Sequence, residues 1–410
     1  MAEGNPQKDG RRVLIIGAVG RVTDETFSGS AGLLSAHALQ MQGAQVTVYE
    51  QDPSPDSRPR DWNFGIYWAQ VPLQDCLPPH LQKEVENAQV DEHRAGDDEV
   101  MPIRNGETGE LLKAVPILYN IRLARKRLLR LISQGLDVQY GKTLRSVSSD
   151  GHHATATFVD GTFATADLLI GAEGAHSKVR DFLVGPVNSA LNPLPLVASV
   201  TIAKLPKSAA LKFKEYASRL MVIFHPLGYF NWIGLHDANA PLEPGDWTFM
   251  MISSWNSPVE EDVSKLRDGG SEAILEDLKR RAEPFEEGIR ELWRSIPEGT
   301  KCWHNRLSEW IPPEAGWDNR NGTVTLVGDA AHPMTFHRGQ GLNNAIHDVA
   351  SLARHIQSQG FTAAALDAYE KEIIPRAREA VKGSTENSLS VHDWSKLVQS
   401  PLFTTGLKQK

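Results

Sequence analysis

The chain has 410 residues, which is long enough for two or three packed regions around a large hydrophobic core. Hydrophobic residues make up 40% and charged residues 23%, proportions typical of globular proteins. The formal net charge of −8 argues against a surface that binds nucleic acid or an anionic membrane.

Cysteine spacing and apolar runs narrow the class of protein. Cys76 and Cys302 are far apart and form no CxxC pair, which excludes a local redox disulfide and a zinc knuckle and suits a reducing compartment. No apolar run reaches membrane-spanning length, and the polar N-terminus lacks the apolar segment of a secretory signal. We therefore expect a cytoplasmic enzyme that binds no metal.

The first predicted unit begins with residues 12–17, a buried strand that ends in glycine and usually opens a dinucleotide-binding βαβ unit. In that pattern two more glycines follow within about five positions. Here Gly32 follows Gly17 by 15 positions (32 − 17). When Val19–Ser28 is left out, the chain reads Gly17-Ala18-Gly29-Ser30-Ala31-Gly32, which is a complete GxGxxG pattern.

Two explanations of Val19–Ser28 stay open. The segment is a polar loop that bulges away while the glycines still converge, or it is intron sequence that was not removed. The second explanation is compatible with the residues, because Val-Gly can be encoded from GT onward and Phe-Ser can contain TTCAG. Transcript sequencing that consistently contained these codons would exclude it.

After this turn the sequence predicts a helix over about 31–42 and a second strand over 45–50. The strand ends at Glu50, 18 positions after Gly32 (50 − 32). An acidic side chain at that distance can bind the hydroxyls of an adenosine ribose. The order of elements is therefore that of a nucleotide-binding unit.

Arginines are concentrated in the next predicted helix, over 121–136. Its apolar residues follow helical spacing, and we expect a solvated basic face for most of its arginines. These arginines are Arg122, Arg125, Arg127 and Arg130. Alternating strands with Asp-Gly turns are expected from 138 to 161.

A second strand that ends in glycine is predicted over 166–171. It is followed by Glu173, Gly174 and a helix start that contains Arg180. Such a turn can approach a pyrophosphate, with Arg180 as either a phosphate partner or a packing partner.

Residues 190–300 have a different character, with strands separated by Gly and Pro turns and two helices at the end. The strands are expected over 197–202, 220–224, 229–235 and 247–253, and the helices near 272–282 and 286–295. Most aromatic residues of this block should be core, and one or two should line a pocket for a flat apolar ligand. They are Phe224, Tyr229, Phe230, Trp232 and Trp247.

A third unit, residues 323–343, combines a strand, a loop and a helix start. The apolar run stops at Gly328-Asp329, and the bend Gly339-Gln340-Gly341 precedes a helix with apolar residues at helical spacing. An Asp at the end of a buried strand can accept hydrogen bonds from ligand hydroxyls, and N–H groups at a helix N-terminus favour negative charge. A flavin needs both, for its ribityl chain and its anionic reduced ring. One more helix is predicted over 363–388, interrupted by Pro375.

The order and spacing of these three turns resembles that of the single-component class A flavoprotein monooxygenases, typified by para-hydroxybenzoate and salicylate hydroxylase. The resemblance covers about 11–388 and is weakest over 190–300. Residues 171–180 match the family's Gly-Ala-Asp-Gly-x-x-Ser-x-Val-Arg motif with Glu173 in place of Asp, and 328–333 read Gly-Asp-Ala-Ala-His-Pro without a change. Phe336 stands where the family usually has Pro, so we expect an altered pocket wall.

The resemblance implies an α/β fold. It consists of a Rossmann-like FAD-binding domain of the para-hydroxybenzoate hydroxylase type, an inserted mixed β-sheet substrate domain and C-terminal helices. The implied ranges are 11–75, 111–189 and 300–358 for the FAD-binding domain, 76–110 and 190–299 for the substrate domain, and 359–410 for the C-terminal helical segment.

The resemblance also implies a reaction. FAD is the cofactor, and NAD(P)H reduces it as a transient co-substrate, since the chain has no second dinucleotide fingerprint. O2 then adds at flavin C4a, and the hydroperoxide hydroxylates or epoxidises an electron-rich small molecule. Glu50 would bind the adenosine ribose, Asp329 the ribityl chain, and Arg125 would lie near the FAD. The implied cofactor-binding residues are Gly17, Ala18, Gly29, Gly32, Glu50, Arg125, Glu173, Asp329, Pro333, Gly339, Gly341, Leu342 and Asn343.

The substrate is less well defined by the sequence. Deprotonation of a substrate would need a base, and His225, Tyr229 and His337 stay open as candidates. The chain has no evident cluster of Arg and Lys for an acidic substrate. We therefore expect an apolar aromatic or polyketide-like compound of secondary metabolism, and a protein that is a monomer or a homodimer.

The sequence lacks the motifs of two other classes of flavoprotein. The Trp-x-Trp-x-Ile-Pro motif of flavin halogenases and the CxxC of disulfide reductases are absent. An FAD-dependent dehydrogenase or oxidase that inserts no oxygen stays open. So does an inactive form in which Val19–Ser28 impairs FAD binding, because displaced backbone N–H groups would leave a buried phosphate without donors.

Overall fold

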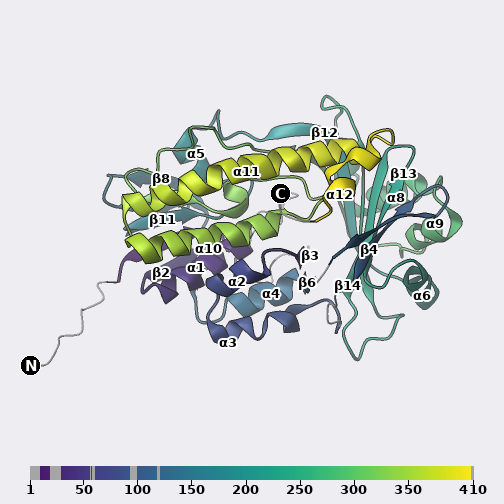
Figure 1. The fold of residues 1–410 in the computed structure, drawn as a ribbon, viewed down its shortest axis with the longest axis horizontal. Coiled ribbons are helices and arrows are strands. Elements are labelled where there is room, and N and C mark those ends of the chain that lie inside the picture. The colour runs from purple at the N-terminus through teal and green to yellow at the C-terminus, as the bar shows by residue number, and fades with distance from the viewer. Residues whose placement is uncertain are drawn as a thin grey trace, which may run out of the picture.

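The computed structural model describes residues 10–18, 29–55, 57, 61–92, 99–117 and 121–407. Val19–Ser28, on which both explanations of the interrupted glycine pattern depend, lies outside the described residues. Two sheets dominate the chain, a five-stranded parallel sheet near the N-terminus and a seven-stranded mixed sheet at the opposite end of the molecule (Figure 1). The predicted α/β architecture is confirmed.

The parallel sheet is built from short, apolar, β-branched runs, which suit strands that are covered on both faces. Ile15 of the central strand lies opposite Ile170 on one side and Val48 on the other. In order across the sheet, the strands are β17 (Val324–Leu326), β11 (Leu168–Gly171), β1 (Arg12–Ile16), β2 (Gln45–Tyr49) and β7 (Asp137–Gln139).

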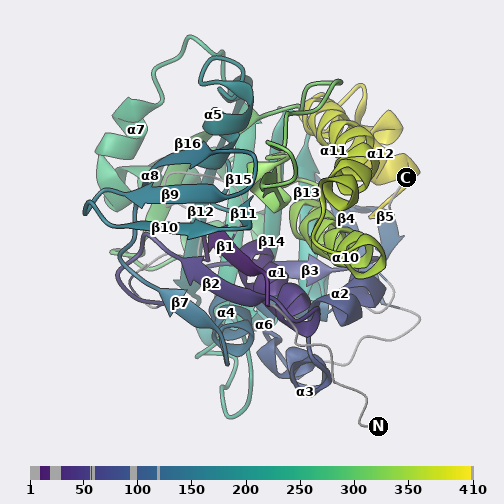
Figure 2. The same ribbon diagram turned by 90° about the vertical axis from the view of Figure 1, so that its left-hand side faces the viewer.

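Helices cover one face of the parallel sheet and a small antiparallel sheet covers the other (Figure 2). On the helical face, α1 (Ser30–Met41) contacts three further helices. They are α2 (Gln70–Cys76), α4 (Arg125–Ile132) and α10 (Gly341–Gln359). The opposite side carries β8 (Leu144–Ser149), β9 (Ala154–Phe158), β10 (Phe163–Ala166) and α5 (Lys178–Val184).

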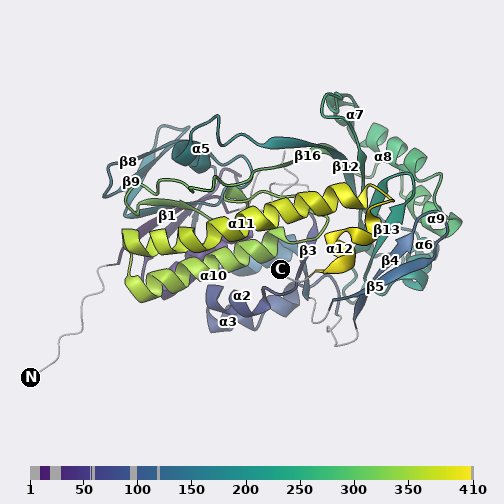
Figure 3. The ribbon, with the colours of Figure 1, turned by 45° about the horizontal axis from the view of Figure 1, so that its top comes forward.

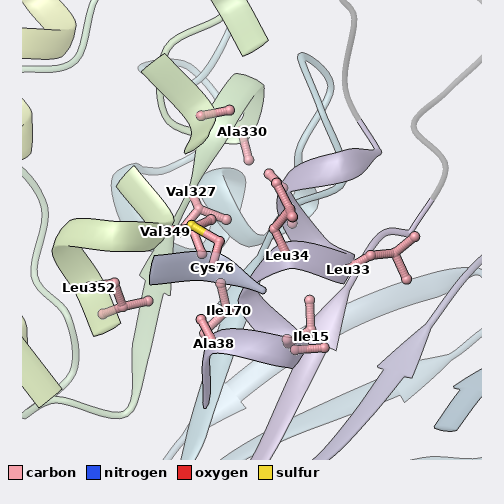
Figure 4. Packing of buried hydrophobic residues seen from close by; sticks show 14 of the residues in the cluster. Ile15, Leu33, Leu34, Ala38, Cys76, Ile170, Val327, Ala330, Val349 and Leu352 are labelled. Atoms are coloured by element: carbon pink, nitrogen blue, oxygen red, sulfur yellow. The ribbon is translucent and has the colours of Figure 1, made fainter. Parts of the chain in front are cut away.

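The largest hydrophobic cluster surrounds the parallel sheet (Figure 4). Ile15 and Ile170 from neighbouring strands meet Leu34 of α1 and Val349 of α10 in this cluster. Burial of each such side chain contributes about 1.5–3 kcal/mol, so the helices are held against the sheet mainly by apolar contacts. Cys76 lies in the same cluster, and burial raises the pKa of its thiol, as expected for a structural cysteine.

The seven-stranded sheet confirms the four strands predicted over 197–253, each extended by a few residues. Among its described strands only β13 and β4 pair in parallel. The order is β16 (Cys302–Glu309), β12 (Asn192–Lys204), β15 (Thr248–Asn256), β14 (Tyr229–Asp237), β13 (Leu220–His225), β4 (Val100–Asn105) and β5 (Leu111–Pro116). One face packs on helices α6 (Lys207–Tyr216), α7 (Ser264–Asp268), α8 (Gly270–Arg281) and α9 (Glu287–Arg294).

Strand pairing corrects two of the predicted ranges. β5, within the range 111–189 assigned to the FAD-binding domain, pairs with β4 in the seven-stranded sheet. β16, within the range 300–358, pairs with β12 in the same sheet. Both strands contribute hydrogen bonds to the sheet of the other half, which the local sequence cannot reveal.

A two-stranded ribbon lies between the two large sheets and corrects the helix predicted over 121–136. The first four residues of that range form β6 (Ile121–Ala124), which pairs with β3 (Asn63–Ile66), and the helix is α4 (Arg125–Ile132). Pairing with a distant strand outweighs the local helical pattern here. The short helices α3 (Pro79–Gln82) and η1 (Val85–Ala88) lie beside this ribbon and α4.

The C-terminal helix α11 (Ala363–Val391) runs beside α10 and reaches the seven-stranded sheet (Figure 3). The prediction that Pro375 interrupts it is wrong, because the helix is continuous through that residue. Burial of Tyr369, Ile373 and Ala377 on its inner face compensates for the missing backbone N–H. The chain then turns back through η3 (Leu397–Gln399) and α12 (Pro401–Thr404). Within the described residues no helix is both long and apolar enough to cross a bilayer.

Candidate active site

At the first turn the end of β1 lies against the start of α1. A Cβ atom on Gly32 would lie 2.0 Å from the carbonyl oxygen of Gly17, so only glycine lets the helix start against the end of the strand. Gly29 stands at the N-cap with φ 125°, and no side chain caps the helix. The structure therefore brings the predicted Gly17, Gly29 and Gly32 together beside backbone N–H groups that suit an anion.

Glu50 lies beside this turn at the end of β2. Its side chain is 1% exposed, and its carboxylate accepts hydrogen bonds from the backbone N–H of Ala18 (2.7 Å) and of Asp52 (2.9 Å). These two bonds orient the Glu50 carboxylate at the first turn. Glu50 and Gly17 line one cavity, together with Lys142.

The second turn reaches the same cavity through Glu173. One of its carboxylate oxygens accepts from the backbone N–H of Val179 (2.8 Å), and the other is buried with no hydrogen-bond partner among the described residues. Burial raises the pKa of this carboxyl group. A hydroxyl donor from a bound nucleotide would satisfy the buried oxygen, so the residues of this cavity fit a dinucleotide.

Arg180 acts as a packing partner in this structure. Its guanidinium donates to the carbonyl oxygens of Ala330 (3.1 Å) and Ser189 (3.2 Å) and lies 4.8 Å from the ring centre of Trp310. It thereby connects the second turn to the third, which contains Ala330. Of the two roles that the sequence left open, this geometry supports packing.

The third turn, η2 (Gly328–Ala330), carries Asp329 and is held by a buried charge network. Asp348 of α10 accepts from the backbone N–H of Gly328 (2.8 Å), from His332 (2.6 Å) and from Arg376 (2.6 Å). Burial would raise the pKa of Asp348, but the charges of His332 and Arg376 outweigh this and hold it well below its usual range. Burial likewise opposes ionisation of His332, and Asp348 outweighs it and raises the pKa of that imidazole.

Asp348 and Arg376 were not predicted as site residues from the sequence. Their signal was weak, because Asp348 lies within an apparently ordinary amphipathic helix and Arg376 is one of many arginines. Only the packing of α10 against α11 shows that both side chains meet at the third turn.

Asn343 ties the glycine bend to the ribbon. Its side chain is fully buried, accepts from the backbone N–H of Tyr67 (2.9 Å) and donates to the carbonyl oxygens of Gly65 and Gly339 (3.1 Å each). Helix α10 begins at Gly341, and no side chain caps its N-terminus. Its first backbone N–H groups therefore remain for an electron-rich ligand, which fits the pyrimidine side of a flavin.

A second cavity opens in front of this helix start, between the ribbon and the seven-stranded sheet. It comprises roughly 620 Å³ of space, part of it open to solvent. Gly339, Gly341 and Leu342 form one side. Its apolar walls are Phe64, Met101, Val222, Phe230, Trp232, Met250, Ile252 and Phe336. Two of the aromatic residues singled out in the sequence, Phe230 and Trp232, thus line the pocket that was predicted for a flat ligand.

The solvated basic face predicted for most of the arginines of 121–136 does not include Arg122 or Arg125, which are both buried. Arg125 is buried and lies 4.5 Å from the ring centre of Trp62. Arg122 is 4% exposed and lines the second cavity, where it lies 4.4 Å from the ring centre of Trp232. The strand β6 turns Arg122 inward, whereas a helix would have left it on the surface.

His337 lines the second cavity, but both of its ring nitrogens are engaged. Nδ1 lies 2.8 Å from Ser388 Oγ and Nε2 lies 3.0 Å from Ser254 Oγ. Ser254 Oγ also lies 2.8 Å from His392 Nε2, and His392 Nδ1 lies 2.6 Å from the Ser388 carbonyl oxygen. These four residues form a closed ring of hydrogen bonds, the histidine–serine ring, between β15, the glycine bend and α11.

The partners define where the protons of this ring lie. His392 Nδ1 must carry a proton, because its partner is a carbonyl oxygen. Ser254 then donates to His392 and accepts from His337 Nε2. His337 Nδ1 faces Ser388 Oγ, whose hydroxyl also donates to the carbonyl oxygen of Ser384 (2.8 Å). Both imidazoles are neutral, in agreement with burial, which lowers the pKa of His337 and lowers that of His392 to about 4. His337 would have to exchange one of these bonds to act as a base.

The other two base candidates do not reach the cavity. His225 and Tyr229 lie opposite each other on neighbouring strands, with side chains on the face that packs against the helices. His225 Nε2 lies 3.1 Å from the carbonyl oxygen of Pro284, and its ring packs on Phe285. Side chains alternate along a strand, so Phe224 and Phe230 face the pocket side and their neighbours face away.

Two remaining predicted residues also have defined places. The Pro333 carbonyl oxygen accepts from the backbone N–H of Trp310 (3.2 Å) and so connects the third turn to the end of β16. Phe336 stacks on His337 at 4.3 Å between ring centres, so it forms an aromatic wall of the second cavity.

Two glycine turns line one cavity, and the helix start that follows the third turn faces an apolar pocket. This arrangement suits a dinucleotide cofactor beside a small-molecule substrate. A family model described as an FAD binding domain matches residues 314–384, which contain the third turn and α10. The FAD-dependent monooxygenase cctM of Talaromyces islandicus is 48% identical over 410 residues, 99% of each chain. The FAD-dependent monooxygenase phnB of Penicillium herquei is 32% identical over 404 residues, 96% of this chain and 94% of phnB. The chain therefore belongs to the FAD-dependent monooxygenases.

Solved structures agree on the fold. HpxO of Klebsiella pneumoniae, complexed with FAD and uric acid, superposes with a TM-score of 0.73 at 20% identity and covers 97% of this chain and 92% of its own. The 2,6-dihydroxypyridine-3-hydroxylase of Arthrobacter nicotinovorans has a TM-score of 0.74 at 17% identity, with 93% of each chain covered. The predicted resemblance to aromatic hydroxylases is confirmed for the fold.

Proposed function

We propose that this FAD-dependent monooxygenase uses NAD(P)H and O2 to hydroxylate or epoxidise an apolar aromatic or polyketide-like molecule of secondary metabolism. The observation that carries the proposal is the second cavity, where aromatic walls meet the uncapped N-terminus of α10. The names and fungal sources of cctM and phnB support the reaction class and the metabolic setting.

Bound FAD would supply the redox chemistry that links NAD(P)H to O2. The dinucleotide end would lie at the first and second turns, with Glu50 on the ribose and Glu173 satisfied by a hydroxyl. The ribityl chain would reach Asp329, and the flavin ring would face the start of α10. The residues proposed to hold FAD are Gly17, Ala18, Gly29, Gly32, Glu50, Arg125, Glu173, Asp329, Pro333, Gly339, Gly341, Leu342 and Asn343.

The chain's own groups would orient the reactants and exclude water. N–H groups at the start of α10 stabilise negative charge, and such charge stabilisation is strongest in a site that water does not enter. The aromatic walls hold a flat substrate. The histidine–serine ring connects the residues before the glycine bend to β15 and α11. Asp348 holds the turn that presents Asp329.

The division into domains stays a proposal. We propose an FAD-binding domain of 11–75, 111–189 and 300–358 and a substrate domain of 76–110 and 190–299, except that β5 and β16 are counted with the substrate domain because of their pairing. Residues 359–410 form the C-terminal segment, whose helix α11 contacts both halves, through Tyr369 on one side and Val391 on the other.

The first experiment is a visible absorption spectrum of the desalted protein beside a variant that lacks Val19–Ser28. Stoichiometric flavin in the full chain would show that Val19–Ser28 is a tolerated loop. Flavin in the deletion variant alone would show that the full chain is the inactive form. Absence of flavin from both would contradict the assignment of all three turns.

A second experiment tests oxygen insertion. The flavin-loaded protein is incubated with NADH or NADPH and candidate aromatic compounds, and products are analysed by mass spectrometry. We expect a product with one added oxygen atom, taken from labelled O2. Consumption of nicotinamide with hydrogen peroxide as the sole oxygen product would instead favour the dehydrogenase or oxidase alternative.

We also propose that the enzyme works in the cytoplasm as a monomer or a homodimer. The absence of an apolar helix that could span a bilayer among the described residues is compatible with this location. Light scattering after size exclusion will distinguish the two assembly states, and a larger assembly would contradict both.

A further inference from the structure

The second cavity receives one side chain from a part of the chain that the flavin motifs do not cover. Leu407 lines this cavity and is 7% exposed. The other lining residues belong to the ribbon or directly follow it, to the seven-stranded sheet, or to the stretch 336–342. The matched family model ends at residue 384, so Leu407 lies outside the part of the chain that it covers.

The 401–407 segment that carries Leu407 packs on the substrate side of the molecule. Its helix α12 lies beside the seven-stranded sheet at the end of α11 (Figure 3). Leu402 is fully buried in one apolar cluster with Leu407 and with Val115 of β5. The rings of Phe403 and Phe224 lie 6.0 Å apart. These contacts hold the segment against the sheet that also supplies the aromatic walls of the cavity.

Hydrogen bonds from two neighbouring elements hold the start of the segment. The backbone N–H of Leu402 donates to Asn387 Oδ1 of α11 (2.9 Å). Lys113 of β5 donates to the carbonyl oxygen of Phe403. Both partners belong to regular elements, so the segment has a fixed starting point.

The end of the segment is bound to the glycine bend. Gln340 Nε2 donates to the carbonyl oxygen of Leu407 (3.3 Å), and Arg338 donates to that of Gly406 (3.2 Å). Trp68 Nε1 donates to Gln340 Oε1 (2.9 Å). Because an indole N–H can only donate, this bond fixes which end of the Gln340 amide faces Leu407. The bend that precedes α10 therefore also positions Leu407.

A glycine turn brings Leu407 to the cavity. Gly406 has φ 66°, in the left-handed region that favours glycine, and a Cβ atom there would lie 3.2 Å from a methyl group of Val115. The chain thus turns tightly beside β5 immediately before Leu407. With hydrogen bonds on the carbonyl groups of both residues, Leu407 cannot move aside without loss of those bonds.

We propose that Leu407 determines the size of the aromatic compound that the second cavity accepts, and that Gln340 and Arg338 hold it in that position. This inference rests on the proposed function, because it concerns substrate selection in the same cavity. If Leu407 served only to pack the apolar cluster, its truncation would lower stability and leave the choice between small and large ligands unchanged.

Calorimetry of the flavin-loaded protein tests the inference with a two-ring probe, 2,7-dihydroxynaphthalene, and a three-ring probe, 2,6-dihydroxyanthraquinone. The quantity compared between variants is the ratio of the two affinities. Leu407→Ala should shift this ratio toward the three-ring probe by roughly tenfold or more, because even one methylene group in an apolar pocket changes discrimination by about that factor. Leu407→Phe should shift it toward the two-ring probe.

The matched control is Val391→Ala. Val391 lies at the end of α11 in the same apolar cluster and does not line the cavity. The control should lower the thermal stability and keep the affinity ratio. Leu407→Val removes a single methylene group and takes the place of Leu407→Ala if that variant does not fold. It should shift the ratio in the same direction by a smaller factor.

Four outcomes would overturn the inference. They are an unchanged ratio in the folded Leu407→Ala or Leu407→Val variant, an equal shift in Val391→Ala, a shift of Leu407→Phe toward the three-ring probe, and no binding of either probe to any variant. Failure of the proposed function would differ from these. The expected shifts in the ratio, with no oxygenated product from any aromatic compound, would refute the reaction and leave the role of Leu407 standing.

Discussion

The two halves of the molecule build their parts of the site in different ways. Around the parallel sheet, the site consists of backbone groups: glycines at strand ends and helix starts, positioned by Glu50 and Asp348. On the seven-stranded sheet, the site consists of side chains that alternate along strands, such as Phe230 and Trp232.

This difference explains why the sequence predicted the part of the site on the parallel sheet and not the part on the seven-stranded sheet. A backbone site needs glycine where a Cβ atom would collide, so it leaves a motif with fixed spacing. A side-chain pocket needs only residues of suitable size on one face of a sheet, and many sequences meet that condition. Changes on the parallel-sheet half should therefore affect flavin content and folding together, and changes on the other half should affect ligand binding.

The largest effect is expected for Asp348→Asn. The change removes one partner of a buried charge network and should destabilise the protein by about 3–5 kcal/mol, with loss of flavin. Thermal unfolding and flavin content measure both. Asp268→Asn on the exposed surface is the control and should leave both unchanged. A stable, flavin-bound Asp348→Asn variant would contradict the view that this network holds the third turn.

The same network makes the stability of the fold depend on pH. Because the pKa of Asp348 is lowered, its ionised carboxylate stabilises the fold at pH values above the unfolded pKa of 3.8. This stabilisation is lost as the pH falls below 3.8 toward the lowered value. Because the pKa of His332 is raised, its protonated imidazole stabilises the fold at pH values below the unfolded pKa of 6.5. This stabilisation is lost as the pH rises through the raised pKa. The difference in stability between the wild type and Asp348→Asn should therefore be greatest between these two values.

A smaller loss is expected for Gly32→Ala. Its Cβ would lie 2.0 Å from the carbonyl oxygen of Gly17, so strand and helix must separate, at a cost of about 1–3 kcal/mol. Flavin binding should fall because the N–H groups of α1 move with the helix. Gly245→Ala is the control, because its Cβ would meet Lys207 at an ordinary distance of 3.4 Å. Equal flavin content in the two variants would contradict the role of the first turn.

Ser254→Ala tests the histidine–serine ring. It leaves a nitrogen of His337 and one of His392 without partners, and we expect a loss of about 1–3 kcal/mol. Both imidazoles have a lowered pKa, so wild-type stability should fall as the pH decreases from 6.5 toward about 4. Ser199→Ala removes a similar bond, to His304 on the same sheet, away from the cavity. Only Ser254→Ala should change the affinity for aromatic probes, and the same change in Ser199→Ala would contradict this.

The smallest effect is expected for Tyr229→Phe. Tyr229 lies on the helix-covered face, so stability should change by no more than about 0.5 kcal/mol and turnover should stay the same. Phe230→Leu changes the next residue, which faces the cavity, and should weaken probe binding. A loss of turnover in Tyr229→Phe with unchanged stability would restore Tyr229 as a base candidate.

Residues of the ribbon show where sequence reasoning failed. The run 121–136 has helical spacing throughout, yet its first four residues pair with β3, and this pairing turns Arg122 into the cavity. The sequence did not choose among His225, Tyr229 and His337 as a base, and the register of β13 and β14 places His225 and Tyr229 on the opposite face.

The family, the order of the three turns and the flavin were predictable from the sequence alone, because glycines and a terminal Asp or Glu are required at defined positions along the chain. It also determined most strands of the middle block through their apolar patterns. Only the tertiary structure decided which side chains line the second cavity. That choice depends on strand register and on which distant segments pair, and a one-residue shift in register turns every side chain of a strand to the other face.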